Sequence, residues 1–254
     1  MAGVLPNLEL RLRIIQNGIA NIFWSWKLDG QGNLPPGKRK PVDVPSDFID
    51  TQKPEQGLNL SSYFNISLNP LQITVKYRSQ ANPSNVFSVD AFVYDQYLNW
   101  IAGTAYSEAG PNFQGIFGLG ERANTNFFYE NGVYSLMTRD AGTPDENGQS
   151  PGKNMYGVHP FFAFRHKANA WVGVLYRLGQ SQDWYVNNDP VAGAVNLITL
   201  SYGGSADIYV MQGTSPDAVV SAYHSMIGFP VMIPQWALGW NQCRWGYKNV
   251  TDLQ

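Results

Sequence analysis

The side chains best suited to chemistry lie in one polar stretch in the middle of the chain. Arg139 and Asp140 form an adjacent charged pair, and Asn154, Tyr156 and His159 add hydrogen-bonding groups and rings. The residues between them are mostly Gly, Pro, Asp, Asn and Ser, the composition of a long ordered loop. Fixed donors and acceptors hold hydroxyl groups, and apolar rings pack on sugar faces. This mixture therefore favours recognition of a polyhydroxylated ligand.

Further carboxylates share the same region. Asp145 and Glu146 lie in the loop with Asp140, and Glu121 precedes it. General acid–base hydrolysis by a carboxyl pair needs two carboxyl groups that converge, and spacing in sequence does not bring two of these together. Loop carboxylates are usually solvated, so we do not expect these residues to catalyse hydrolysis unaided.

No metal or cofactor site is expected. The three histidines, His159, His166 and His224, lack the paired spacing of metal ligands. His159 precedes a proline at the start of a strand, which indicates a hydrogen-bonded structural role. The single cysteine, Cys243, excludes an intrachain disulfide and is interpreted as a small buried side chain rather than a nucleophile.

Composition excludes several classes of partner. The net charge of -2 provides no basic field for nucleic acid. No apolar run is long enough to span a membrane, and the first residues lack the pattern of a secretory signal. Charged residues are 14% of the chain, below the usual quarter, and aromatic residues are also 14%, which favours β-sheets with ring-lined surfaces.

The elements that must position the polar stretch are mostly strands. Apolar and polar residues alternate with period two in many short segments separated by turn residues, which predicts an antiparallel meander of two packed sheets. Asn17 and Gly18 predict a turn between the first two strands, and Trp24 and Trp26 are expected on one face of the second. The expected strands cover residues 8–13, 19–28, 63–68, 71–77, 86–94, 161–165, 170–178, 183–186, 195–200 and 206–211.

One helix is predicted after the last of these strands. Ser215, Pro216 and an early acid form a helix start, and Gly228 ends the pattern. We expect Val219, Val220, Tyr223 and Ile227 to pack against the sheets, with His224 half-exposed. The change of period places a domain boundary here, with a β-sandwich over residues 1–213 and a second unit over residues 214–254.

Four ordered motifs carry a resemblance to a known family. The segments F-G-L-G-E-R, Y-S-L-M-T-R-D and K-N-M-Y-G-V-H-P-F-F resemble the amino-terminal β-domain of glycoside hydrolase family 31, the α-glucosidase and α-xylosidase group. A fourth segment, I-P-Q-W-A-L-G-W-N-Q-C-R-W-G-Y-K-N-V-T-D-L, resembles the start of that family's catalytic β/α barrel.

The resemblance implies a fold, an activity and two site residues. The fold would be a galactose-mutarotase-like antiparallel β-sandwich, followed by a short helix and the first strand of a barrel, over residues 236–245. By motif match, Asp140 would help to hold a substrate sugar, or alternatively only stabilise its own loop. Trp245 would line the pocket at the cleavage point, or alternatively only fill the barrel.

The resemblance also implies what this chain lacks. The family's acid and nucleophile lie on later barrel strands, so none of its catalytic carboxylates is expected within these 254 residues. The function implied is the amino-terminal part of a retaining hydrolase of α-linked glucose or xylose. A downstream barrel polypeptide, or another protein, would cover the exposed strand. The alternative is a non-catalytic carbohydrate-binding or assembly module. A full-length parent would be secretory, lysosomal or extracellular.

Overall fold

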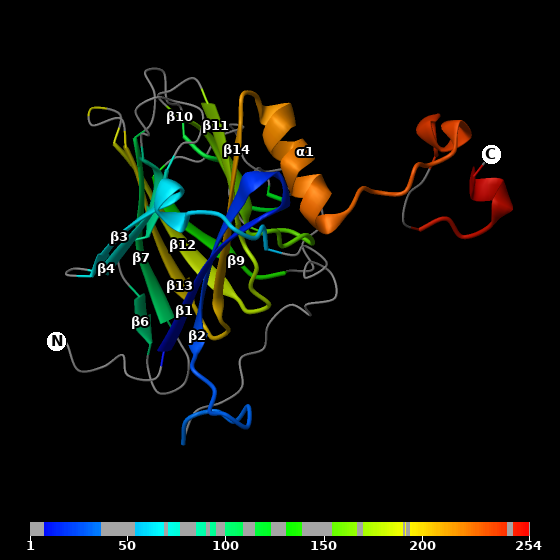
Figure 1. Ribbon diagram of the computed structural model, residues 1–254. Coiled ribbons are helices and arrows are strands. Elements are labelled where there is room, and N and C mark those ends of the chain that lie inside the picture. Colours follow the sequence, from blue (N-terminus) through cyan, green and yellow to red (C-terminus); the bar gives the residue numbers. More distant parts are fainter. Residues whose placement is uncertain are drawn as a thin grey trace.

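The computed structural model describes residues 8–36, 54–68, 71–76, 85–89, 92–94, 100–108, 115–122, 131–138, 154–166, 170–189, 191, 194–242 and 246–253. These residues form two antiparallel sheets that pack against each other, with one α-helix against the outer face of the first (Figure 1). The mainly β, antiparallel sandwich predicted from the period-two pattern is confirmed.

The first sheet, sheet A, has six strands. In spatial order these are β1 (Leu8–Ile15), β2 (Ile19–Trp26), β14 (Ala206–Gly213), β11 (Ala170–Tyr176), β10 (Phe161–His166) and β8 (Phe117–Gly118). A turn at Gln16–Gly18 joins β1 to β2. Asn17 and Gly18 both adopt positive φ there, 63° and 70°, which Asn and Gly tolerate better than other residues.

The second sheet, sheet B, has eight strands. Its main path runs β3 (Phe64–Leu68), β4 (Leu71–Lys76), β5 (Asn85–Val89), β7 (Trp100–Glu108), β13 (Ala194–Ser201), β12 (Gln182–Asp189) and β9 (Gly132–Leu136), and β6 (Phe92–Tyr94) pairs with β7. Strands β10 to β14 and β1 to β4 lie where the alternating pattern predicted them.

The core lies between the two sheets. In the strands whose side chains the structure describes, alternate residues point inward, and Trp184 meets both Tyr176 and Phe162 edge to face, at ring-centroid distances of 4.7 and 5.4 Å. Trp24 and Trp26 are both buried on the inner face of β2, as predicted. Such aromatic pairs contribute about 0.5–1.5 kcal/mol each beyond the area that they bury.

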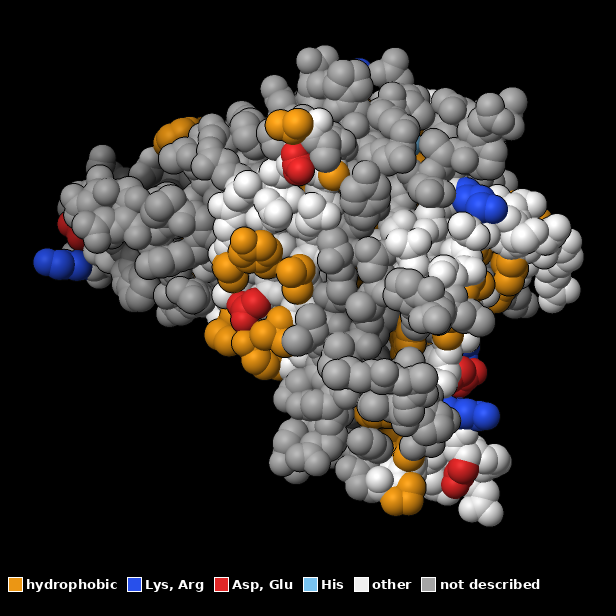
Figure 2. All heavy atoms as spheres, turned by 90° about the vertical axis from the view of Figure 1, so that its left-hand side faces the viewer, with side chains coloured by type: hydrophobic (Ala, Val, Ile, Leu, Met, Phe, Trp, Pro, Cys, Tyr) orange, Lys and Arg blue, Asp and Glu red, His pale blue; other side chains and the backbone are white. Residues whose placement is uncertain are grey.

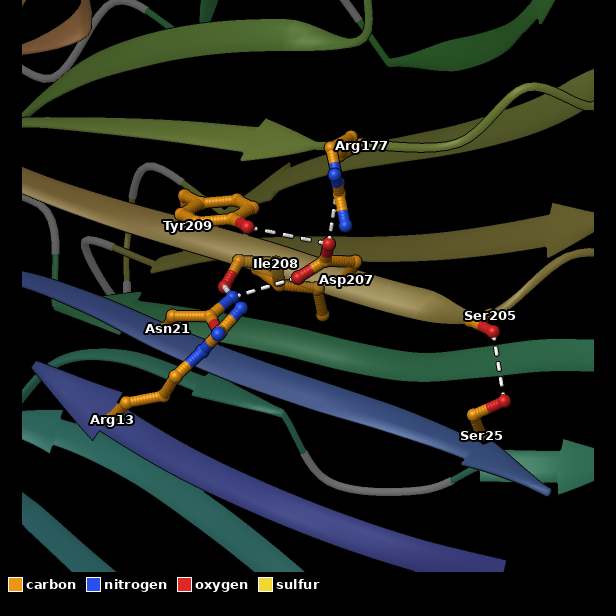
Figure 3. A network of polar contacts seen from close by, with 8 residues as sticks. All are labelled: Arg13, Asn21, Ser25, Arg177, Ser205, Asp207, Ile208 and Tyr209. Carbon is orange, nitrogen blue, oxygen red and sulfur yellow. Dashed lines mark hydrogen bonds and ion pairs between the residues drawn. The ribbon is translucent and has the colours of Figure 1, made fainter. Parts of the chain in front are cut away.

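The outer face of sheet A carries a buried polar network (Figure 3). Arg177 Nε donates to Asp207 Oδ2 at 2.6 Å, and Asn21 Nδ2 donates to Asp207 Oδ1 at 2.8 Å. Arg13 Nε in turn donates to Asn21 Oδ1 at 2.7 Å. Asp207 is only 1% exposed, and this desolvation raises the pKa of its carboxyl even though Arg177 opposes the shift. The network therefore ties β1, β2 and β14 to the residue that follows β11.

Helix α1 (Pro216–Ile227) begins and ends as predicted. The Ser215 hydroxyl accepts a hydrogen bond from the Ala218 N–H at 3.2 Å, and Gly228 follows the last turn at φ 93°. Its buried side chains are Val219 and Met226, whereas Val220 and Ile227 are exposed, so that part of the predicted packing stripe was wrong. The two buried positions lie seven residues apart, on one helix face, which the exposed pair does not share.

The helix approaches the sheet closely because two facing strands carry glycines. A Cβ at Gly173 of β11 would lie 2.4 Å from Val219 Cγ1, and one at Gly213 would lie 2.8 Å from Ala218 Cβ.

In the described part of the chain, no helix is both long and apolar enough to cross a membrane.

The segment after α1 departs from prediction. Instead of the first barrel strand expected over residues 236–245, Gln235–Leu238 forms a 3-10 helix, residues 239–242 are irregular, and residues 243–245 lie outside the described part. A strand needs a neighbour for its backbone hydrogen bonds, and this segment extends away from both sheets (Figure 1). Val250–Leu253 forms a last 3-10 helix.

Candidate functional site

The two site residues implied by the motifs, Asp140 and Trp245, lie outside the described residues, as do Arg139, Asp145 and Glu146. Their roles therefore stay predictions. The structure does describe the chain on both sides of the segment that carries Asp140. Those flanks show how the described residues that precede and follow this segment are held in place.

One flank pairs with the segment that precedes β9. The Glu121 N–H donates to the Gly157 carbonyl at 3.0 Å, and the Met155 N–H donates to the Glu121 carbonyl at 2.9 Å. The Glu121 carboxylate accepts a third bond from the Gly157 N–H at 2.9 Å. Glu121 therefore has a structural role: it holds the backbone of residues 155–157 in place.

The G-L-G turn before Glu121 makes this pairing possible. Leu119 is fully buried at φ 59°, and Gly120 follows at φ 83°. A Cβ at Gly120 would lie 2.8 Å from the Gly157 carbonyl oxygen. Glycine is required at position 120 because the two backbones approach each other too closely for a side chain.

Arg122 joins both flanks. Its Nε donates to the Leu119 carbonyl at 3.1 Å, and its Nη2 donates to the Ser135 carbonyl and, at 3.4 Å, to Asn154 Oδ1. The guanidinium also lies over the Tyr134 ring, 5.6 Å from its centroid. Ser135 stands near the end of β9, before the Asp140 segment, and Asn154 stands after it. A single side chain therefore fixes the distance between the entry and exit of that segment.

Sequence reasoning missed the role of Arg122, although this residue ends the F-G-L-G-E-R motif. It also misjudged Asn154, which was expected to face a ligand. Asn154 is buried, and its Nδ2 donates to the Met155 and Gly157 carbonyls at 3.0 and 3.3 Å. Tyr156, by contrast, is half exposed and presents its ring to solvent.

His159 connects this region to helix α1. Its Nε2 and the Tyr223 hydroxyl form a hydrogen bond, and its ring stacks on Phe161 at a centroid distance of 5.8 Å. Partial burial lowers the pKa of His159 and raises the pKa of Tyr223, so both groups favour their neutral forms. The hydrogen-bonded structural role predicted for His159 is confirmed. Among the described residues, no three His, Cys, Asp or Glu side chains gather as metal ligands.

Comparison with known proteins identifies similar chains. A probable alpha-glucosidase of Oryza sativa subsp. japonica is 30% identical over 227 residues, which are 84% of this chain and 24% of that protein. Alpha-xylosidase 1 of Arabidopsis thaliana is 30% identical over 204 residues, 75% of this chain and 20% of that protein. No protein-family model matches the chain.

The fold is also found among solved structures. The Tris-bound glucosidase II alpha subunit superimposes with a TM-score of 0.72 at 14% identity, over 97% of this chain and 33% of that one. This likeness establishes a shared fold. The chain spans a third or less of the length of each of these three proteins.

Proposed function

Because this chain belongs to glycoside hydrolase family 31, we propose that it is the amino-terminal β-domain of a retaining α-glucosidase-like enzyme. The β-sandwich would comprise residues 1–213, and residues 214–254 would link it to a catalytic β/α barrel. The complete enzyme would remove terminal α-linked glucose or xylose, and its two catalytic carboxyl groups would come from the barrel.

The observation that carries this proposal is the tie made by Arg122. Arg122 bonds to both Ser135 and Asn154, so the described residues on the two sides of the Asp140 segment are held in place. A side chain contributes to substrate binding only when its support is rigid, because a displacement of about 1 Å already lowers the rate strongly. In this proposal, the sandwich presents Asp140 to a sugar bound at the barrel.

The exposed chain after α1 supports the link to a barrel. Met232, Trp236 and Trp240 are 92%, 77% and 89% exposed, and Leu238 is exposed as well. Large apolar side chains exposed in one contiguous segment mark a surface that another part of the protein covers. We propose that barrel polypeptide covers them and that Trp245 then faces the sugar pocket.

A non-catalytic carbohydrate-binding or assembly module is the second candidate. The same exposed segment favours it, because apolar side chains in this position also fit a separate protein. An assembly module would bind that protein without supplying any residue to a hydrolytic site.

The test is the kinetics of a polypeptide that joins this chain to its barrel. Asp140→Ala is expected to lower kcat/KM for 4-nitrophenyl α-glucoside at least about tenfold, because a hydrogen bond to a charged acceptor is lost. Asp145→Ala removes the same charge from the same segment and serves as the matched control. Normal kinetics in Asp140→Ala combined with a large fall in Tm would contradict the proposed contact.

A further inference from the structure

An apolar row crosses three strands on the outer face of sheet B. Val133 of β9 pairs with Tyr185 of β12, and Tyr185 pairs on its other side with Ile198 of β13. Their side chains are 64%, 47% and 41% exposed. Since neighbouring strands are about 4.8 Å apart, the row spans about 10 Å. The row is an apolar strip with Tyr185 at its centre.

Hydrogen-bonding rows flank this strip on both sides. On one side, Asp183 accepts hydrogen bonds from the Ser135 hydroxyl and, at 2.8 Å, from the Tyr202 hydroxyl. On the other side lie Asn187 and Asn196, which are directly paired. A carboxylate accepts about four hydrogen bonds, so Asp183 retains room for two more donors. It also raises the pKa of Tyr202, which keeps that hydroxyl a neutral donor.

Charge and size narrow the choice of ligand. The residues of these rows are Val133, Ser135, Asp183, Tyr185, Asn187, Asn196, Ile198 and Leu200, and Asp183 alone among them is charged. An anionic ligand such as a phosphate, a nucleic acid or an acidic lipid would meet a carboxylate without a cation. A stable protein interface needs about 20–30 residues on each side, far more than these rows offer. A neutral polyhydroxylated chain fits both limits, because its rings pack on apolar side chains while its hydroxyls donate.

We propose that this outer face of sheet B is a carbohydrate-binding surface. A neutral oligosaccharide would pack its rings on Tyr185 and Ile198 and donate hydroxyl hydrogen bonds to Asp183. Helix α1 and the exposed C-terminal segment lie on the side of sheet A, so this surface faces away from them (Figure 1). Figure 2 shows hydrophobic side chains gathered around an acidic one on this side of the molecule.

The surface is also connected to the candidate site. Ser135 donates its hydroxyl to Asp183 and accepts from Arg122 at its carbonyl. A glycan held here would therefore lie along the strand that leads to Asp140. The choice of an α-linked glucose chain as a probe rests on the proposed function, whereas the surface itself does not.

The test is titration of the 254-residue chain with maltohexaose, followed by amide chemical shifts or by calorimetry. Tyr185→Ala is expected to weaken binding about tenfold because the stacking ring is lost. Tyr185→Phe keeps the ring and should bind within about twofold of the original protein. Phe229→Ala removes an exposed aromatic ring that follows α1, on the side of sheet A, and should leave the affinity unchanged.

Three outcomes would overturn the proposal: no saturable binding of maltohexaose or cellohexaose by the original chain, loss of binding in Phe229→Ala but not in Tyr185→Ala, or self-association that Tyr185→Ala abolishes. Equal binding of cellohexaose supports the surface, because stacking does not select a linkage. An enzyme with normal Asp140→Ala kinetics would refute the proposed role of Asp140 and leave this surface intact.

Discussion

The two outer faces of the sandwich carry similar residues in different surroundings. On sheet A, Asp207 and Tyr209 alternate along β14 and are both buried. On sheet B, Asp183 and Tyr185 alternate along β12, and Tyr185 is half exposed. The same pair of residue types thus stabilises the fold where it is covered and stays available to a ligand where it is open. Burial, rather than residue type, decides the role.

The two faces are expected to differ most in the unfolding free energy that is lost when their carboxylate is removed. Asp207→Ala leaves the Arg177 guanidinium buried without its ion pair and is expected to cost about 3–5 kcal/mol of unfolding free energy. Asp183→Ala on the open face is expected to cost less than about 1 kcal/mol, because water replaces the lost contacts. Chemical denaturation of both variants measures the difference, and equal losses would remove the distinction between the faces.

A smaller loss of unfolding free energy is expected when the hydrogen bonds of Arg122 are removed. Arg122→Ala loses its hydrogen bonds to Leu119, Ser135 and Asn154 and should cost about 1–3 kcal/mol. The matched control is Arg11→Ala, which breaks an exposed ion pair with Glu9 at 2.8 Å and should cost less than about 1 kcal/mol. If Arg122→Ala unfolds at the same denaturant concentration as Arg11→Ala, the tie does not hold the flanks together.

The close packing of α1 on sheet A can be tested by adding a methyl group at the contact. Gly173→Ala forces a methyl group against Val219 and should cost about 1–3 kcal/mol. Gly132→Ala adds the same methyl group to β9 of sheet B, where the nearest heavy atom lies 3.8 Å away, and should change stability by less than about 0.5 kcal/mol. Thermal unfolding distinguishes the two, and a neutral Gly173→Ala would mean that the helix is free to move outward.

The smallest expected effect is a pH dependence at His159. Its pKa in the folded protein is lower than in the unfolded chain, so the unfolded state binds the proton more readily. The stability contributed by neutral His159 is therefore present above about pH 6.5 and is lost as the pH falls towards the folded-state pKa. His159→Phe should remove this slope between about pH 5 and 7 in denaturation curves. An unchanged slope would assign it to another group.

Much of the sandwich could be predicted from the sequence, because alternating apolar and polar residues indicate which face of each strand is buried. The start of α1 was equally readable, since Ser215 and Pro216 act within one turn. The prediction of a barrel strand was wrong. A strand forms only when a neighbouring strand pairs with it, and the sequence of one segment does not show whether such a neighbour is present. The role of Arg122 escaped prediction because its partners, Ser135 and Asn154, are distant in sequence.

The most direct test of the central claim is release of 4-nitrophenol from 4-nitrophenyl α-glucoside by this chain alone and by the same chain joined to its barrel. We expect no turnover by the 254-residue chain and steady turnover by the joined polypeptide. Steady turnover by the chain alone, or none by the joined polypeptide with either the α-glucoside or the α-xyloside, would contradict the assignment of these residues to the amino-terminal domain of the enzyme.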